Sequence, residues 1–356
     1  MSIYEPPTYE EPIDLDLSRN EGRPALDDID LDIRTMGSLV GRYPDTSRLA
    51  GLIAARHEVE KERVLVTAGG DDAIFRCMLW CRASKIVTTT PTFEMIPRYA
   101  EQAGALLAEI PWWDGGPPTD DMAESEADVA VIVSPNNPTG SMIEETDLLH
   151  LADRFRFVVL DAAYAEFADI DLTPAALRLS NVVVVRTFSK AFGLAGLRVG
   201  YLLGAPDLVR EVGAFGSPYA VSALSAVVAS DALQTGRGRV VRYARKVVDE
   251  RARLVELLRE FGAAPLPSQG NFVLATDTDP ETVVSSAASL GVGLRRFPGR
   301  PGLERCVRIG LPGVAEDFDR LVSVLATVFT QDPEMEVADV TRGECSPDGR
   351  ADQEDR

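Results

Sequence analysis

The sequence predicts an α/β protein, with a large domain built on a mainly parallel, mixed sheet flanked by helices and a small α+β domain towards the C-terminal end. Short β-branched runs alternate with helical segments through the first two thirds of the chain, which is typical of a parallel sheet covered on both faces. A long Arg- and Leu-rich helical stretch then runs from about Thr235 to Phe261. The length of 356 residues allows two domains.

The expected elements follow one another in a regular order. Strands are predicted at Val64–Thr67, Lys85–Thr90, Asp128–Val133, Phe157–Asp161, Val182–Arg186, Asn271–Thr276 and Cys306–Leu311. Helices are predicted at Thr46–Arg56 with Asp45 or Thr46 as the N-cap, after the Gly69-Gly70 turn to about Arg82, and at Met95–Ala103, Pro280–Leu290 and Ala315–Phe329. We expect an irregular N-terminal arm (1–35), a large domain (36–250), a small domain (251–330) and a disordered acidic tail (331–356).

Composition and charge narrow the possible partners and the location of the protein. The formal net charge of −20 argues against nucleic acid, because phosphate neutralisation requires clustered basic residues, although locally concentrated arginines can still bind a small anion. No apolar run approaches a membrane span, and the acidic, proline-rich start lacks the features of a secretory signal. We therefore expect no membrane contact and a cytoplasmic protein.

Histidine and cysteine usage gives little support for a metal site. Only two histidines are present, His57 and His150, so a His-rich metal site is not expected. Cys77 and Cys81 lie four residues apart in a predicted helix. We interpret them as small apolar residues of a helix face.

A lysine follows the end of a predicted strand. Lys190 comes after Val182–Arg186, and ligands bind beyond the carboxyl ends of parallel strands. Partial desolvation there lowers the pKa of an amine and makes it able to form a Schiff base. Thr187 and Ser189 flank this lysine and can bind a phosphate, with Arg198 as a countercharge. Taken alone, the Ser-Lys pair is more typical of a surface lysine.

Polar residues follow three other strands at the same expected edge. Asp161 ends one strand and Tyr164 follows it; pyridoxal phosphate (PLP) needs an anion beside its ring nitrogen. Asn137 lies in the turn at 134–140 and can donate, like Tyr164, to the ring's phenolate oxygen. Gly70 opens a helix whose backbone N–H groups can bind phosphate. Individually, Asp161 can be a helix cap or ion-pair partner, and 134–140 a plain turn.

Together these segments resemble the class I and II aminotransferases of PLP fold type I, and among these they are most similar to the histidinol-phosphate aminotransferases. The resemblance covers roughly Asn20 to Phe329. It is carried by Ser-Pro-Asn-Asn-Pro-Thr-Gly at 134–140, Asp-Ala-Ala-Tyr at 161–164, Thr-Phe-Ser-Lys-Ala-Phe-Gly-Leu-Ala-Gly-Leu-Arg at 187–198 and Val-Arg-Ile-Gly at 307–310.

The resemblance implies roles for the cofactor-binding residues. Lys190 would hold PLP as a Schiff base and move a proton between substrate Cα and the cofactor's C4′, with Asp161 and Tyr164 as the other catalytic residues. The implied cofactor-binding set is Gly70, Asp71, Phe93, Asn137, Asp161, Tyr164, Thr187, Ser189, Lys190, Arg198 and Tyr43. Phe93 would stack on the ring, where the family more often has Tyr. Tyr43 would reach the phosphate held by a neighbouring subunit, which implies a homodimer.

The resemblance also implies the substrate contacts and the reaction. Arg308 would grip the substrate's anionic group, Arg295 a substrate phosphate, and Asn20 would contact the substrate. The implied reaction is a ping-pong transfer from an amino acid or an amino-alcohol phosphate such as histidinol phosphate to a 2-oxo acid such as 2-oxoglutarate, in amino-acid and specifically histidine biosynthesis. The family's Tyr-Gly-Met becomes Phe93-Glu94-Met95, and its Asn-Glu-Asn-Pro survives only in part at 20–24; both departures leave the amino donor open.

Other functions of the same fold remain to be weighed. A PLP-dependent decarboxylase or lyase, such as threonine-phosphate decarboxylase, and an aminotransferase for aromatic or specialised-pathway amino acids use the same set of residues. A ligand-sensing regulator would need a DNA-binding helix-turn-helix region, for which the arm is too short and too acidic.

Overall fold

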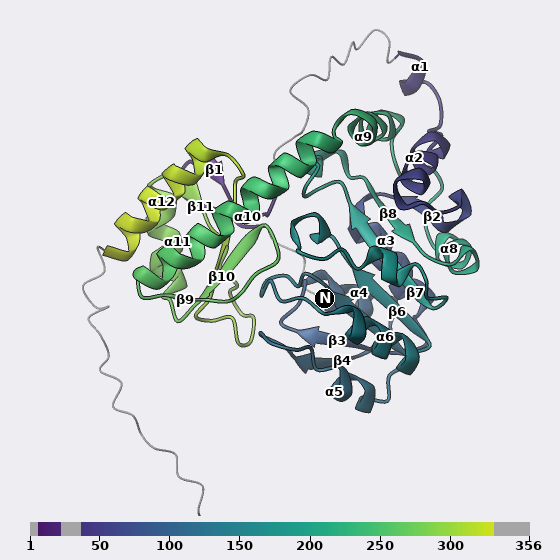
Figure 1. The fold of residues 1–356 in the computed structure, drawn as a ribbon, viewed down its shortest axis with the longest axis horizontal. Coiled ribbons are helices and arrows are strands. Elements are labelled where there is room, and N and C mark those ends of the chain that lie inside the picture. Colours follow the sequence, from purple (N-terminus) through teal and green to yellow (C-terminus); the bar gives the residue numbers. More distant parts are fainter. Residues whose placement is uncertain (1–5, 23–36, 331–356) are drawn as a thin grey trace, which may run out of the picture.

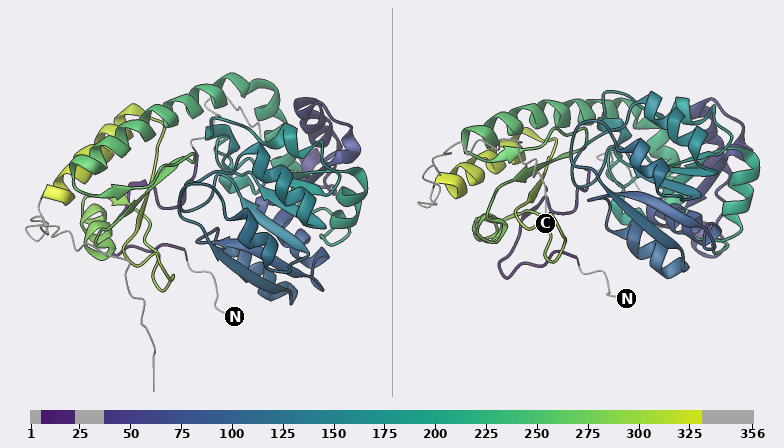
Figure 2. Two further views of the ribbon diagram at one scale, coloured as in Figure 1. Left: turned by 60° about the horizontal axis from the view of Figure 1, so that its bottom comes forward. Right: turned by 90° about the horizontal axis from the view of Figure 1, so that it is seen from below.

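The structure of the chain is a computed structural model that describes residues 6–22 and 37–330. The larger part of the molecule is organised around one seven-stranded sheet, and a smaller part with a three-stranded sheet lies at the other end of a long helix (Figures 1 and 2). The α/β fold class expected from the sequence is confirmed.

The large sheet is mostly parallel. Its strands lie in the order β2 (Val64–Thr67), β8 (Gly200–Leu203), β7 (Val182–Thr187), β6 (Phe157–Asp161), β5 (Val129–Val133), β3 (Lys85–Thr90) and β4 (Leu106–Pro111). Strands β4, β3, β5, β6 and β7 pair in parallel, and β8 runs antiparallel to both β7 and β2. Strands β5, β6 and β7 are buried along their whole length, which explains their continuous apolar sequences.

Helices cover both faces of this sheet. One face packs against α3 (Gly69–Trp80), α4 (Met95–Ala103) and α8 (Pro206–Gly213). The opposite face packs against α2 (Ser47–His57), α6 (Glu145–Arg154), α7 (Thr173–Ala176) and α9 (Ala223–Thr235). The remaining short helices are α1 (Gly37–Val40), α5 (Thr119–Glu124), η1 (Lys61–Arg63), η2 (Ala165–Phe167) and η3 (Ala195–Leu197).

The smaller part is connected through helix α10 (Arg237–Glu260), which runs along both parts in Figures 1 and 2. Its antiparallel sheet has the order β12 (Val307–Gly310), β10 (Phe272–Thr276) and β9 (Ala264–Pro265), and it is accompanied by α11 (Pro280–Ser289) and α12 (Ala315–Thr330). The N-terminal segment joins this part, because β1 (Leu15–Asp16) pairs in parallel with β11 (Val292–Gly293). Residues 6–22 therefore belong to the small part by contact, although they come first in sequence.

Several expectations need correction. The arm is not wholly irregular, since it contributes β1. The helical stretch expected from about Thr235 to Phe261 corresponds to α10, which begins at Arg237 after α9 has ended at Thr235. Strands β4 and β8 and helices α6, α8 and α9 have no counterpart among the predicted elements. The short edge strand β4 is partly exposed, so its apolar signal is diluted. The predicted domain boundary at residue 250 falls inside α10 and stays a prediction; the tail at 331–356 lies outside the described residues.

The two cysteines of α3 are packing residues, as expected. Cys77 and Cys81 are both buried and unpaired, in the cluster between α3 and the sheet. Burial raises the pKa of the Cys81 thiol to about 12. A protonated, buried thiol is inert and behaves as a small apolar side chain.

Candidate active site

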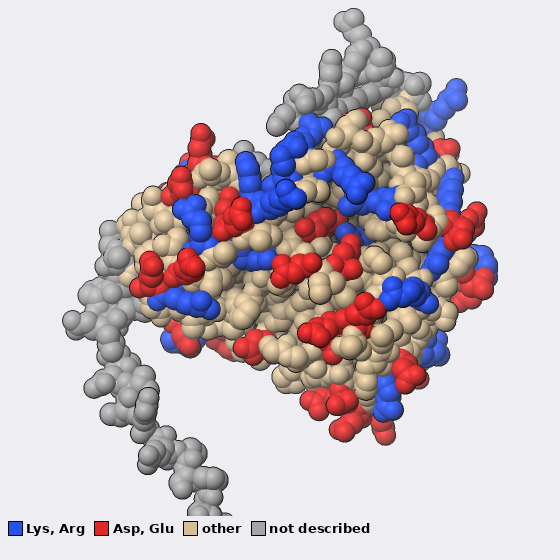
Figure 3. Space-filling view, in the orientation of Figure 1, with Lys and Arg blue, Asp and Glu red and all other residues tan. Residues whose placement is uncertain are grey.

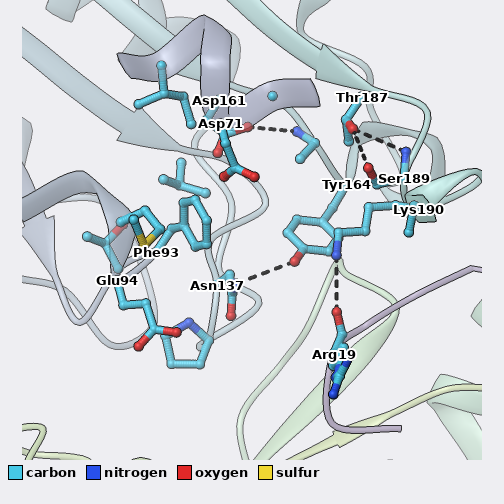
Figure 4. A pocket seen from close by; sticks show the side chains of 18 of the residues that line it. Arg19, Asp71, Phe93, Glu94, Asn137, Asp161, Tyr164, Thr187, Ser189 and Lys190 are labelled. Atoms are coloured by element: carbon cyan, nitrogen blue, oxygen red, sulfur yellow. Dashed lines mark hydrogen bonds between the residues drawn. The ribbon is translucent and has the colours of Figure 1, made fainter. Parts of the chain in front are cut away.

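A cavity of about 410 Å³ opens at the carboxyl ends of β5, β6 and β7 (Figure 4). This volume lies within the range of small-molecule and cofactor sites. The structure brings the sequence-predicted residues together here, with the exception of Asn20 and Tyr43. The predicted residues that line the cavity are Gly70, Asp71, Phe93, Asn137, Asp161, Tyr164, Thr187, Ser189, Lys190, Arg198, Arg295 and Arg308.

Lys190 projects into this cavity from the loop after β7 (Figure 4). Its Nζ lies 5.6 Å from the ring centroid of Tyr164 and donates to the main-chain oxygen of Arg19 at 3.2 Å. The N-terminal segment crosses directly over this loop: a Cβ on Gly22 would lie 1.6 Å from the carbonyl oxygen of Lys190. Only glycine permits that approach. Sequence reasoning missed Arg19 because its contact uses the main chain, which leaves no side-chain pattern.

Asp161 is the last residue of β6 and its carboxylate is almost completely buried. One oxygen accepts from the backbone N–H of Ala163 at 3.1 Å. Burial raises the pKa of this carboxyl from 3.8 to about 7, against the smaller lowering by that N–H group and by the Lys190 ammonium. The protein alone therefore stabilises the charged form poorly, and a cationic ring nitrogen beside this carboxylate would stabilise it.

The start of α3 forms a cradle for an oxyanion. Gly69 has a φ of +85°, and a Cβ there would lie 2.8 Å from Nη2 of Arg198. The N-cap residue of α3 is Ala68, which offers no side-chain cap to the N–H groups of the first turn. On the facing loop the Thr187 hydroxyl donates to the Ser189 hydroxyl at 2.9 Å. Exposed helix N–H groups, hydroxyls and a guanidinium together are the donors that phosphate prefers.

Asn137 connects the two ends of the cavity. Its Nδ2 donates to the Tyr164 hydroxyl at 3.4 Å, and its Oδ1 accepts from Nη1 of Arg308 at 2.6 Å. Asn20 does not line the cavity, yet its Nδ2 also donates to the Tyr164 hydroxyl at 3.4 Å. Nη2 of Arg308 donates to the main-chain oxygen of Ser18 at 2.5 Å. The arm thus holds both the tyrosine and the arginine of the site.

Arg295 lies beside Arg308, because the two residues form an antiparallel β-bridge. Both guanidinium carbons lie within 6 Å of the Phe297 ring centroid, at 5.7 and 5.8 Å. Nη2 of Arg295 forms an ion pair with Glu94 at 3.1 Å, and Arg300 approaches the same carboxylate at 3.8 Å. Sequence reasoning recognised Glu94 only as a departure from the family pattern. It missed the ion pair because the partners are far apart in the chain.

Tyr43 is, like Asn20, a predicted residue that does not line the cavity of its own chain. Its side chain is 81% exposed and stacks on Tyr219, with ring centroids 4.6 Å apart.

The residues of the cavity fit PLP. The cradle at α3 matches its phosphate, the buried Asp161 its ring nitrogen, the Tyr164 and Asn137 pair its ring hydroxyl, and the Lys190 amine its aldehyde. A fold of this kind, with a lysine, a buried carboxylate and an oxyanion cradle around one cavity, defines a PLP-dependent enzyme of fold type I.

Comparisons with known proteins specify the family. The chain matches the family model described as Aminotransferase class I and II over residues 25–325. It is 31% identical over 304 residues to a histidinol-phosphate aminotransferase of Caldanaerobacter subterraneus subsp. tengcongensis, covering 82% of this chain and 85% of that protein. It is 32% identical over 296 residues to an aromatic amino acid aminotransferase of Mycobacteroides abscessus, covering 78% and 82%.

A solved structure agrees with this assignment. The crystal structure of histidinol-phosphate aminotransferase from Sinorhizobium meliloti in complex with pyridoxal-5'-phosphate superposes with a TM-score of 0.79 at 25% identity, covering 90% of this chain and 92% of that one. The chain belongs to the class I and II aminotransferases. It is a PLP-dependent aminotransferase, which confirms the fold type, the cofactor and the reaction class expected from the sequence.

Proposed function

We propose that this aminotransferase takes the amino group from a donor whose anionic group is held by Arg308 and passes it to a 2-oxo acid such as 2-oxoglutarate by a ping-pong mechanism. The observation that carries the proposal is that Lys190, Asp161 and Arg308 meet around one cavity. Six basic side chains line it against four acidic ones, so the site has an excess of positive charge that attracts anions although the chain is acidic. The basic residues are Arg19, Lys190, Arg198, Arg295, Arg300 and Arg308, and the acidic ones are Glu21, Asp71, Glu94 and Asp161.

The proposed catalytic work is divided among a few residues. Bound PLP supplies an electron-poor ring that accepts the electron pair released when a bond to the donor's Cα breaks. The Lys190 amine would accept the Cα proton and return it to the cofactor's C4′. The Asp161 carboxylate would keep a proton on the ring nitrogen. Asn137 and Tyr164 would hold the ring hydroxyl, and Thr187, Ser189, Arg198 and the backbone of Gly70 and Asp71 would hold the phosphate.

Arg308 sets the orientation of the donor. A planar guanidinium binds a carboxylate or phosphate through two parallel hydrogen bonds. Because Asn137 contacts both Arg308 and Tyr164, the anionic end of the donor is placed in register with the cofactor ring. Residues Ser18 to Gly22 lie across the site and restrict access of water to the reacting atoms.

Two donors are supported by different observations. Histidinol phosphate, and with it a role in histidine biosynthesis, is supported by the names of several relatives. An amino acid with a free carboxylate, such as an aromatic amino acid, is supported by the name of the Mycobacteroides abscessus relative and by the ion pair between Arg295 and Glu94.

A panel of amino donors tests the reaction. The holoenzyme is incubated with 2-oxoglutarate and, separately, with histidinol phosphate and each aromatic amino acid. We expect glutamate to form in a 1:1 ratio with the keto product of at least one donor, with no release of carbon dioxide. Carbon dioxide and an amine without glutamate would favour the decarboxylase alternative and contradict the proposed transfer.

We further propose that the enzyme works as a homodimer. Apolar side chains are exposed around α1, α9 and the start of α10: Val40, Tyr43, Tyr219, Leu224, Val227 and Val241. Exposed apolar patches of this kind support an interface, and a two-fold dimer is the commonest assembly. Tyr43 belongs to this patch, so association would allow it to reach the cavity of the partner subunit.

A charge placed in this patch tests the dimer. Val227→Asp buries a carboxylate in the proposed interface, so we expect light scattering coupled to gel filtration to show one chain where the wild type shows two. Leu149→Asp is the matched control, because Leu149 is similarly exposed (44% against 41% for Val227) but lies on α6. A wild-type protein that elutes as a single chain would contradict the proposal.

We also propose a cytoplasmic location and small-molecule partners. The cysteines among the described residues are unpaired and buried, which is typical of a reducing compartment. None of the helices within 6–22 and 37–330 is both long and apolar enough to cross a bilayer. On the face in Figure 3, acidic and basic side chains are mixed over the lower part, and basic side chains gather over α10, whose first ten residues include four arginines and one lysine.

A further inference from the structure

Glu94 lies on the wall of the cavity opposite Lys190 (Figure 4). It occupies the N-cap position of α4, where a carboxylate would normally accept from the first-turn N–H groups. The side chain of Glu94 makes no such capping bond. Its carboxylate instead contacts Arg295 at 3.1 Å and Arg300 at 3.8 Å. Glu94 therefore serves the arginines of the small part of the molecule and not its own helix.

Arg295 and Arg300 are held in place by the short segment from Thr92 to Glu94. The Arg295 side chain is only 11% exposed and that of Glu94 21%, so solvent weakens their attraction less than at an open surface. Nη2 of Arg300 also donates to the main-chain oxygen of Thr92 at 3.1 Å. Glu94 and the two arginines together carry one net positive charge. Arg296, by contrast, pairs with Glu281 and does not line the cavity.

The geometry of the strands would otherwise favour a doubly charged ligand. Arg295 and Arg308 form a β-bridge, and side chains directly opposite in an antiparallel pair lie on the same face. Their guanidinium groups flank one ring, Phe297. Two such groups suit a phosphate monoester, which carries a charge of about −1.5 to −2 at pH 7. With Glu94 bound to Arg295, the two guanidinium groups that flank Phe297 and this carboxylate together carry one net positive charge, which suits a single carboxylate.

We propose that Glu94 is a specificity-determining residue that neutralises Arg295 and so selects a donor with a carboxylate over a donor with a phosphate ester at the Arg308 position. The inference rests on the proposed function and names its donor class as an α-amino acid. Histidinol phosphate would have to displace a carboxylate that is already bound to Arg295, and its phosphate would lie close to Glu94.

Binding of two unreactive ligands to the holoenzyme tests this selectivity. We use 3-phenylpropionate and 2-phenylethyl phosphate, which share an aromatic body and differ in the anionic group. Calorimetry should show tighter binding of the carboxylate by the wild type. Glu94→Gln should shift the ratio of the two dissociation constants about tenfold towards the phosphate ester, because a charge-assisted contact to Arg295 becomes available.

Two further variants identify the origin of the shift. Glu124→Gln removes one negative charge from an exposed position on α5 and should leave the ratio unchanged. The double variant Glu94→Gln with Arg295→Gln should lose the gain for the phosphate ester, since Arg295 is the proposed new partner. The absorption spectrum of PLP bound to each variant is compared with that of the wild type, and an unchanged spectrum shows that the site is intact.

Two results would overturn the inference. The first is that the wild type binds the phosphate ester more tightly than the carboxylate. The second is that Glu94→Gln leaves the ratio of the two dissociation constants unchanged. The ligands are not turned over, so these results are independent of catalysis. Failure of the proposed amino transfer would appear separately, as the absence of glutamate with every donor.

Discussion

Replacement of Lys190 with alanine is expected to lower the turnover number by roughly 10⁴-fold or more. General acid–base catalysis contributes about 10²–10⁴-fold in enzymes, and this variant also loses the amine that attaches the cofactor covalently. The structure supports the size of the effect, because Lys190 is the lysine that lines the cavity among the described residues. None of the other described residues that line the cavity is a lysine that could replace it.

The measurement combines turnover with the absorption spectrum of the cofactor. The variant should bind PLP without the absorption band of the lysine-linked form and should show no burst of keto product. Lys61→Ala is the control, since Lys61 is exposed in η1, away from the cavity. A Lys190→Ala protein that kept the lysine-linked band and turned over at the wild-type rate would refute the assignment of this residue.

Asp161→Asn is expected to lower the turnover number by about 10³-fold, as an order-of-magnitude expectation for loss of a buried charge that stabilises the transition state. Asparagine keeps the shape of the side chain but removes the anion that holds a proton on the ring nitrogen. The loss should appear in the turnover number at saturating donor, because the proposed role places Asp161 beside the cofactor and not beside the donor. An Asp161→Asn enzyme within tenfold of the wild type would contradict this role.

The same substitution should stabilise the cofactor-free protein at high pH. The pKa of Asp161 is raised from 3.8 to about 7 in the folded state, so the unfolded chain loses this proton first as the pH rises. The contribution of Asp161 to the free energy of unfolding is therefore full below pH 4. It falls as the pH rises from 4 to 7, and above pH 7 the free energy of unfolding is lower by up to about 4 kcal/mol.

Chemical denaturation of the cofactor-free proteins at pH 4 and pH 8 checks this sign. The free energy of unfolding of Asp161→Asn minus that of the wild type should be more positive at pH 8 than at pH 4. Comparison with the variant at each pH isolates Asp161 from other titrating groups, such as Glu250, whose pKa is also raised to about 7 by burial. Equal differences at the two pH values would show that ionisation of Asp161 does not destabilise the folded, cofactor-free protein.

The fold was largely predictable because its signals are local. Strands β3 and β6 and helix α4 begin and end where the apolar runs and helical periodicity indicate. The prediction missed β8, a four-residue strand that follows directly on the lysine loop and runs antiparallel to its neighbours. A short strand flanked by loop residues has little periodicity, and its state is decided by the partner strands between which it pairs.

The cofactor site was predictable because of topology. The lysine and the asparagine each follow a parallel strand and the aspartate ends one, and the carboxyl ends of parallel strands meet at one edge of the sheet. Their proximity follows from chain direction alone. The substrate side of the cavity obeys no such rule, since Ser18, Glu94 and Arg308 come from three distant segments of the chain.

By itself, the sequence determined the α/β class, the aminotransferase chemistry and most of the residues that line the cavity, because each of these depends on side chains within a few positions of a strand end. Tertiary structure alone decided that Glu94 pairs with Arg295, 201 residues away, that the arm covers Lys190, and that Tyr43 faces outward. Contacts over such separations depend on how packed elements are oriented in space, and no local pattern of residues encodes that orientation.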